Sequence, residues 1–278
     1  MHADMRTIGP TSQTVVLRPA TEATDWPILI GLLGSFRVLR NGSPVAMHGG
    51  AKSASLLRHL ALSPGYQAAR DVLLDVLWRG TDPEFAGQSL NSLVYSLRKL
   101  LGPALGGASP VQCVDGYYCL NQEAGVGVDV ACFEALAQAG DPHACVSMGA
   151  GAAESCVKAL ALYRGDLCAD QDMHSIVERE RLRSRYLGLL ARLAEYHYNE
   201  RAYAQCLTYA LKLLANDLCR EDGHRLVMRS YMGLGERAQA LHQYRLCEAA
   251  LRQEFDAVPE PATAALFDQL RGYPRSCA

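Results

Sequence analysis

Residues 84–101 read EFAGQSLNSLVYSLRKLL and are followed by Gly102-Pro103. Their apolar residues recur at helical spacing, and the glycine and proline end the pattern, so we expect one helix here. At 100° per residue the apolar residues fall on one broad stripe, which consists of Ala86, Leu90, Leu93, Val94, Leu97, Leu100 and Leu101. The opposite side carries Gln88, Asn91, Ser92, Tyr95, Arg98 and Lys99. This helix should therefore bury one face and present a polar face to a partner.

The residues before this helix predict a small antiparallel sheet and two shorter helices. Short apolar runs over residues 28–47 are interrupted by turn residues, and Asn41-Gly42 between two of them is a strong hairpin signal. The first helix ends at Pro64-Gly65 and has an apolar stripe of Leu56, Leu57, Leu60 and Ala61. The second runs from Asp71 to Trp78, and we expect its inward residues to be Val72, Leu73, Val76 and Leu77.

A loop over residues 79–83 leads into the helix 84–101, and the hairpin VQCV-DG-YYCL, residues 111–120, follows it. With a two-residue turn, Cys113 should face Tyr118 rather than Cys119. The order sheet, helix, helix, loop, helix, hairpin is that of a winged helix-turn-helix, whose third helix enters the major groove of DNA. Gln and Asn pair with adenine edges, Ser with either kind of edge, and Lys or Arg with guanine or phosphate. Any surface helix has a polar face, but the position of this one favours DNA reading.

Beyond Val128 the strand signals fade and helices dominate. We expect helices over residues 133–139, 153–163 and 176–198, with a Gly/Ala-rich loop over residues 141–151. Two helix pairs then repeat at an interval of 34, which is the tetratricopeptide period. The first set of matched residues is Leu193, Ala194, His197, Cys206, Leu207 and Ala210. The second set is Val227, Met228, Tyr231, Ala240, Leu241 and Tyr244. The fold class expected is mostly α, with an N-terminal winged helix and C-terminal all-α repeats of this kind.

Charge differs between the two halves. Residues 28–122 hold eight Lys and Arg against five Asp and Glu, a net charge of +3. Residues 123–278 hold seventeen against twenty-one, a net charge of −4. A basic front and an acidic back are consistent with a nucleic-acid reader joined to a domain that does not bind nucleic acid.

Composition and motifs exclude several other classes of protein. Apolar residues make up 49% of the chain, but no uncharged apolar run reaches the roughly 20 residues of a membrane span. The polar tail over residues 1–27 lacks the apolar core of a secretory signal, so we expect a cytoplasmic protein that does not contact a membrane. The ten cysteines form no CxxC pair and are expected to be free thiols. Residues 49–53 lack a glycine that a phosphate-binding loop requires, and no nucleophile–base arrangement stands out. We therefore expect no metal, no cofactor and no enzymatic activity.

Two long stretches carry a family resemblance. The segments LLGSFRVLRNGSPV, RDVLLDVLW, DPEFAGQSLNSLVYSLRKLLG and VDGYYCL resemble the OmpR-type winged helix of the Streptomyces antibiotic regulatory protein family. The segments VDVACFEAL, ALALYRGDL, ERERLRSRYLGLLARLAE, GERAQALHQYRLCEAALRQEF and PEPATAALFDQL resemble the bacterial transcriptional activator domain of that family. Together they cover residues 29–271, with both modules in the family's order.

The polar residues 1–27 are expected to form a flexible tail. The resemblance implies a winged-helix DNA-binding domain over 28–122 and an activator domain over 128–272. It implies a regulator that binds double-stranded promoter DNA, often as direct repeats, and recruits RNA polymerase. Lys52 would lie near the DNA backbone, and the polymerase-facing loop would be Arg79, Gly80, Thr81 and Asp82. Two features depart from the family: Gly87 and Ser96 stand where members commonly carry Arg, and residues 111–120 hold no basic residue.

Three readings of the function remain open. The first is a DNA-binding activator modulated through its repeats, and the second is a protein–protein adaptor whose winged helix no longer binds DNA. The third, a hydrolase or transferase within the helical part, has no motif in its favour. Also open are tandem binding or a homodimer, and a small molecule, nucleotide or protein as ligand of the repeats.

Overall fold

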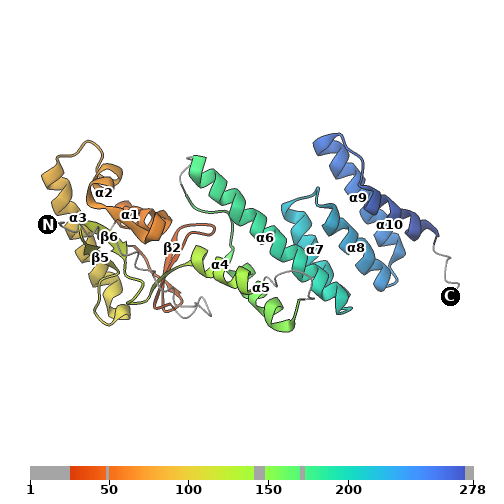
Figure 1. The fold of residues 1–278 in the computed structure, drawn as a ribbon, viewed down its shortest axis with the longest axis horizontal. Coiled ribbons are helices and arrows are strands. Elements are labelled where there is room, and N and C mark those ends of the chain that lie inside the picture. The colour runs from red at the N-terminus through yellow and green to blue at the C-terminus, as the bar shows by residue number, and fades with distance from the viewer. Residues whose placement is uncertain (1–25, 48–49, 141–147, 170–172, 273–278) are drawn as a thin grey trace, which may run out of the picture.

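The computed structural model describes residues 26–47, 50–140, 148–169 and 173–272. Figure 1 shows an elongated molecule, with a compact unit of strands and helices at one end and a row of helices extending from it. Nearly all of the expected tail over 1–27, and most of the loop expected over 141–151, lie outside the described residues.

The first sheet extends beyond the small antiparallel sheet expected over residues 28–47, because a fourth strand from later in the chain joins it. In spatial order the strands are β3 (Ser43–Pro44), β2 (Arg37–Arg40), β1 (Ile28–Gly31) and β7 (Val126–Val128). The first three pair antiparallel as predicted, whereas β7 pairs parallel with β1. A Cβ on Gly127 would collide with the ring of Trp26, so the glycine lets the indole cover β7.

Three helices and a second sheet complete the winged helix. The helices are α1 (Gly50–Leu62), α2 (Arg70–Leu77) and α3 (Pro83–Leu101), with 3₁₀ turns η2 (Pro64–Tyr66) and η3 (Gly102–Leu105). The antiparallel sheet has the order β4 (Gln67–Ala69), β6 (Tyr117–Leu120) and β5 (Val111–Val114). The stripe expected on α1 is buried. Of the inward face expected on α2, Leu73 and Leu77 are buried, but the prediction is wrong for Val72 and Val76. Val72 and Val76 are 47% and 49% exposed, because this short helix is rotated to bury Leu74 beside Leu73 and Leu77.

The helical half continues as antiparallel neighbours. Its helices are α4 (Asp129–Ala139), α5 (Ala150–Leu162), α6 (Met173–Asn199), α7 (Tyr203–Asn216), α8 (Glu221–Gly233), α9 (Arg237–Phe255) and α10 (Pro261–Gly272). The small residues predicted where paired helices approach closely, Ala194, Cys206 and Ala240, are fully buried. Met228, the large exception in the pattern, is buried as well. The 34-residue pattern therefore identifies the packing face of the repeats correctly.

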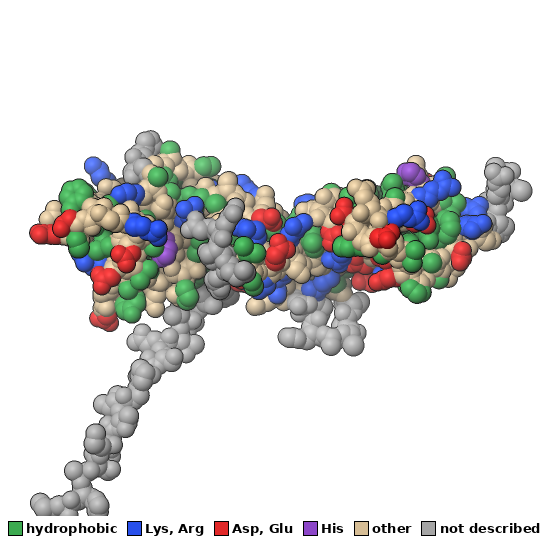
Figure 2. All heavy atoms as spheres, turned by 90° about the horizontal axis from the view of Figure 1, so that it is seen from above, with side chains coloured by type: hydrophobic (Ala, Val, Ile, Leu, Met, Phe, Trp, Pro, Cys, Tyr) green, Lys and Arg blue, Asp and Glu red, His purple; other side chains and the backbone are tan. Residues whose placement is uncertain are grey.

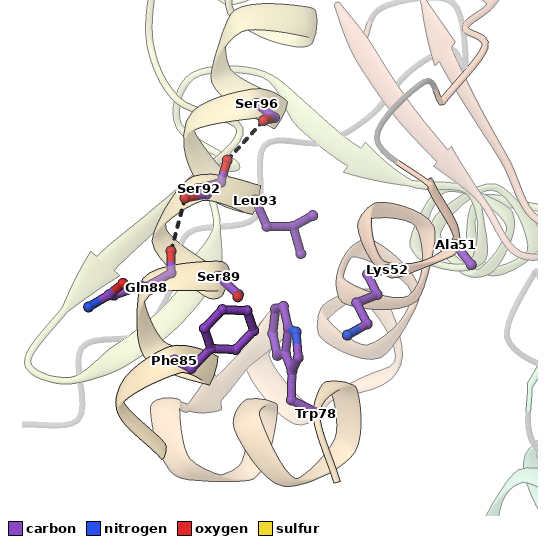
Figure 3. Close-up of a pocket in the computed structure, with 9 residues that line it drawn as sticks. All are labelled: Ala51, Lys52, Trp78, Phe85, Gln88, Ser89, Ser92, Leu93 and Ser96. Atoms are coloured by element: carbon purple, nitrogen blue, oxygen red, sulfur yellow. Dashed lines mark hydrogen bonds between the residues drawn. The ribbon is translucent and has the colours of Figure 1, made fainter. Parts of the chain in front are cut away.

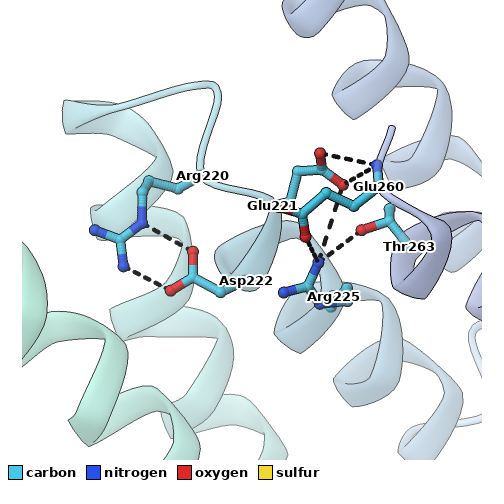
Figure 4. Close-up of polar contacts among 6 residues, drawn as sticks. All are labelled: Arg220, Glu221, Asp222, Arg225, Glu260 and Thr263. Carbon is cyan, nitrogen blue, oxygen red and sulfur yellow. Dashed lines mark hydrogen bonds and ion pairs between the residues drawn. The ribbon is translucent and has the colours of Figure 1, made fainter. Parts of the chain in front are cut away.

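Polar contacts hold α10 against α8 (Figure 4). The Arg225 guanidinium donates to the Thr263 hydroxyl at 2.8 Å and to the Glu260 carboxylate at 3.2 Å. The Glu221 carboxylate accepts the backbone N–H of Glu260 at 3.0 Å. These bonds join the start of α10 to α8 and so fix the last helix of the row in place.

A buried carboxylate joins the two halves of the molecule. Asp129, the first residue of α4, has no exposed surface and accepts the backbone N–H groups of Leu32 and Leu33 at 2.8 and 3.1 Å. The Arg37 guanidinium donates to the same carboxylate at 3.1 Å. Burial raises the pKa of Asp129, and these three donors oppose the rise. One hydrophobic cluster runs without a break from Ile28 to Leu213, so the winged helix and the first helices share a core.

Candidate nucleic-acid interface

The helix α3 has the two faces that the sequence predicts. Of the expected apolar stripe, Ala86, Leu90, Leu97 and Leu101 are buried, and Leu93, Val94 and Leu100 are half-buried. All six residues of the opposite side, Gln88, Asn91, Ser92, Tyr95, Arg98 and Lys99, are exposed. Tyr95 has 70% of its surface accessible. We call these six side chains the reading face; it is stiffened by the buried stripe beneath it.

The start of α3 is fixed by the loop before it. The Asp82 carboxylate accepts the backbone N–H groups of Glu84 and Phe85 at 3.0 and 3.2 Å, which is a helix N-cap. The four loop residues expected to face polymerase, Arg79, Gly80, Thr81 and Asp82, are all exposed. Asp82 thus has a capping role in addition to its expected place in the polymerase-facing loop.

A hollow of about 610 Å³ lies between the N-terminal end of α1, the end of α2 and α3 (Figure 3). The Lys52 ammonium lies 4.6 Å from the centre of the Trp78 ring, within range of a cation–π contact. Gln88 and Ser92 line the same hollow, so the structure brings three of the predicted DNA-binding residues together. Figure 3 shows Gln88 pointing outward, away from Trp78 and Phe85.

The sequence pattern does not predict Trp78 and Phe85 as part of this surface. It places Trp78 at the end of a helix and does not single out Phe85. Both line the hollow, and Phe85 is 61% exposed. An aromatic residue in the first turn of a helix, off its apolar stripe, was the signal that could have found Phe85.

Two hydroxyls on α3 bond to the helix itself. Ser92 Oγ donates to the carbonyl of Gln88 at 3.0 Å, and Ser96 Oγ donates to the carbonyl of Ser92 at 2.9 Å. These i to i−4 bonds use the hydroxyl hydrogens, and the oxygens remain able to accept. Ser92 is therefore set to accept from the amino group of cytosine or adenine rather than to donate.

The second sheet orients Asn91. The Tyr118 hydroxyl donates to Asn91 Oδ1 at 3.2 Å, and Tyr118 is itself buried. Burial raises the pKa of the Tyr118 phenol, and the nearby charge of Arg70 opposes the rise. The protonated hydroxyl contacts Asn91 Oδ1, which leaves the Nδ2 donors of Asn91 for other acceptors.

Arg98 and Lys99 lie apart from the cluster around Gln88. They are in the last turn of α3, roughly 16 Å along the helix axis from Gln88 at 1.5 Å per residue. Arg98 Nε donates to the carbonyl of Gly107 at 3.3 Å. Recognition helices contact base edges mainly through their N-terminal residues, so this end is better placed for phosphate.

The charge around the reading face is modest. Residues 28–122 hold eight Lys and Arg against five Asp and Glu, and Figure 2 shows acidic and basic side chains interspersed on the face of the molecule that it presents. The tip of the hairpin formed by β5 and β6 exposes the apolar residues Val114 and Tyr117, which flank Asp115. Cations near the reading face therefore decide how strongly it attracts a polyanion.

Within the described residues, no group of three or more His, Cys, Asp or Glu could hold a metal ion. In the same part of the chain, no helix is both long and apolar enough to cross a membrane. The eight cysteines in it are free.

Comparison with known proteins assigns the helical half of the chain to a protein family. Residues 128–271, slightly more than half of the chain, match the family described as the bacterial transcriptional activator domain. The chain belongs to this family. Its members are transcriptional regulators rather than enzymes, and the two modules make this chain a regulator of the Streptomyces antibiotic regulatory protein type. The resemblance found in the sequence is thereby confirmed.

A curated relative and a solved structure extend the likeness of this family member beyond the matched domain. The regulatory protein AfsR of Streptomyces coelicolor is 26% identical over 253 residues, which are 91% of this chain and 25% of AfsR. The chain thus spans about a quarter of the length of that relative. The structure of Mycobacterium tuberculosis EmbR, solved in complex with a low affinity phosphopeptide, is similar with a TM-score of 0.68 at 23% identity. The match covers 90% of this chain and 66% of EmbR, and it confirms the expected fold class.

Proposed function

We propose that the chain is a sequence-specific DNA-binding transcriptional activator that works on promoter DNA in the cytoplasm. The observation that carries the proposal is the exposed reading face of α3, capped at its start by Asp82 and oriented from the second sheet through Tyr118 and Asn91. Amide and hydroxyl groups on a rigid helix are what base edges require. Lys52, Arg98 and Lys99 supply cations around it for phosphate.

The proposal divides the work between the two modules. The winged helix over 28–122 reads DNA, the exposed loop Arg79–Asp82 faces RNA polymerase, and the activator domain over 128–272 modulates both. Two features support this division. The activator domain is net acidic, which disfavours its own contact with DNA, and Asp129 connects it directly to the first sheet.

Selection of bound fragments from a fragmented genome tests the proposal. The full chain should enrich a limited set of fragments that share a repeated motif. Asn91→Ala and Gln88→Ala should weaken binding to the best fragment and relax preference at particular positions, since each removes a group able to pair with adenine. Glu195→Ala, an exposed change on α6 in the other half, should leave binding unchanged.

The alternative is a protein–protein adaptor, and the feature that favours it is the β5–β6 hairpin without a basic residue. In that case the folded chain enriches no fragment over a random background at low salt. That result would contradict the proposed function.

A further inference from the structure

A glycine on α3 is covered by an arginine from another helix. Gly87 is buried although it adjoins the reading face: it is next to Gln88 in the sequence and one helical turn before Asn91. A Cβ built on Gly87 would collide with Nη2 of Arg70 and would lie 3.3 Å from its Cζ. The guanidinium of Arg70 therefore occupies the volume that a side chain at position 87 would fill.

Arg70 is held in place at its backbone. It is the first residue of α2, and its N–H donates to the carbonyl of Gly116 at 3.2 Å, in the turn between β5 and β6. Its Cα is thus fixed beside the hairpin, while its side chain extends over α3. The side chain lies on the flank of α3 that carries Asn91.

The charge of Arg70 is available to a ligand. Its ion-pair partner Asp71 is 3.9 Å away and has 93% of its side chain exposed, so solvent screens the pair and it contributes little. The Arg70 side chain is itself 46% exposed. No residue of the hairpin over 111–120 is basic, and Arg98, on the same flank, lies near the other end of α3. Arg70 therefore brings a cation to the start of the reading face, beside Gly87 and Asn91.

We propose that Arg70 is a DNA-contacting residue, delivered across Gly87 onto the recognition surface beside Asn91. A guanidinium there binds acceptor atoms of double-stranded DNA, either O6 and N7 of a guanine or the oxygens of a phosphate. The proposal assigns Gly87 a specific part, because only a residue without a side chain leaves the path of Arg70 open. It rests on the proposed function.

Four variants of the full chain test it, on the best fragment from the genomic selection. Arg70→Ala should weaken binding by about tenfold, the order expected for one direct contact. Gly87→Ala should weaken it comparably. This change removes no charge and favours the helix, so loss of binding would reflect displacement of the guanidinium rather than unfolding. The double variant should bind like Arg70→Ala alone, because both changes act on one group. Arg245→Ala, which removes an equal charge from the exposed side of α9, is the matched control.

The salt dependence of the affinity separates the two acceptors. Loss of a phosphate contact lowers the slope of log K against log salt by about 1 and affects all sequences alike, whereas loss of a guanine contact relaxes preference at one base pair. Either result supports the proposal.

The proposal is overturned if Arg70→Ala binds as Arg245→Ala does while Asn91→Ala weakens binding, and the proposed function then stands. It is equally overturned if Gly87→Ala binds like the wild type while Arg70→Ala is weakened. If the wild type binds no fragment, the proposed function fails and this inference fails with it.

Discussion

Replacing Asp129 with Ala should destabilise the winged helix more than any surface change. The substitution removes the acceptor of three donors at once: the amides of Leu32 and Leu33 and the guanidinium of Arg37. Only 16% of the Arg37 side chain is exposed, so water reaches the freed guanidinium poorly. Leu32 and Leu33 lie between β1 and β2, and Arg37 is the first residue of β2, which is why we expect the first sheet to loosen.

The magnitude follows from these contacts. A buried donor without its acceptor costs about 1–3 kcal/mol, and removing one partner of a buried ion pair costs about 3–5 kcal/mol. These two costs cannot be added, because a single carboxylate accepts from all three donors. We therefore expect a loss of about 3–5 kcal/mol in the free energy of unfolding.

Urea unfolding followed by tryptophan fluorescence measures the loss, because Trp26 covers β7 and Trp78 ends α2. Glu134→Ala on the same helix is the control. Glu134 pairs with Arg181 at 2.5 Å on the surface, and its loss should cost less than about 1 kcal/mol. Equal losses for the Asp129 and Glu134 variants would refute the reasoning. So would a double-mutant cycle of Asp129 and Arg37 with no coupling energy.

Three further predictions concern binding and pH. Lys99→Ala should weaken DNA binding by roughly 1 kcal/mol without unfolding, whereas Leu97→Ala should cost about 2–5 kcal/mol of stability; unchanged affinity of folded Lys99→Ala would show that the reading face is wrongly chosen. The chain should bind DNA with two half-sites about one helical turn apart more tightly than DNA with one, since one winged helix offers few phosphate contacts. The slope of log K against log salt should be about −3 on one half-site and double that on two. Equal affinity and slope on both targets would contradict tandem binding. Burial lowers the pKa of His224, which bonds Leu218 and Gln243 as a neutral ring. The unfolded chain then binds more protons below pH about 6.5, so stability should fall as pH drops through that value. His224→Gln should flatten this fall in urea titrations, and parallel curves for both proteins would exclude His224 as the cause.

Local periodicity identified those parts of the fold that local contacts determine. The opposed faces of α3 follow from helical spacing alone, and burial agrees with the spacing. The turn at Asp115 and Gly116 has both φ angles positive, at 51° and 82°, as expected for Asp-Gly in a two-residue hairpin. Cys113 accordingly pairs with Tyr118 in the ladder, as predicted.

Features that depend on distant packing did not follow from the pattern. The strand β7 has three residues with a glycine in the middle, and its partner β1 lies nearly a hundred residues earlier. The inward side of α2 was misassigned because eight residues show too few turns to choose between adjacent stripes. The contact of Arg70 with Gly87 depends on how α2 crosses α3. The spacing of residues along the chain does not predict that crossing.

The shared core implies that the proposed boundary between 122 and 128 separates functions and not folding units. A fragment of residues 28–122 lacks β7 and Asp129, so β1 loses a parallel neighbour and two buried amides lose their acceptors. A fragment of residues 26–216 keeps both, together with the whole cluster from Ile28 to Leu213. We expect the longer fragment to unfold cooperatively and to retain the sequence preference of the full chain, and the shorter one to be markedly less stable. Melting temperatures and binding to the selected fragment, measured on both, test the expectation. If the shorter fragment melts as high as the longer one, the contacts of α4 with the first sheet contribute nothing to the stability of the DNA reader, and modulation by the repeats would need another route.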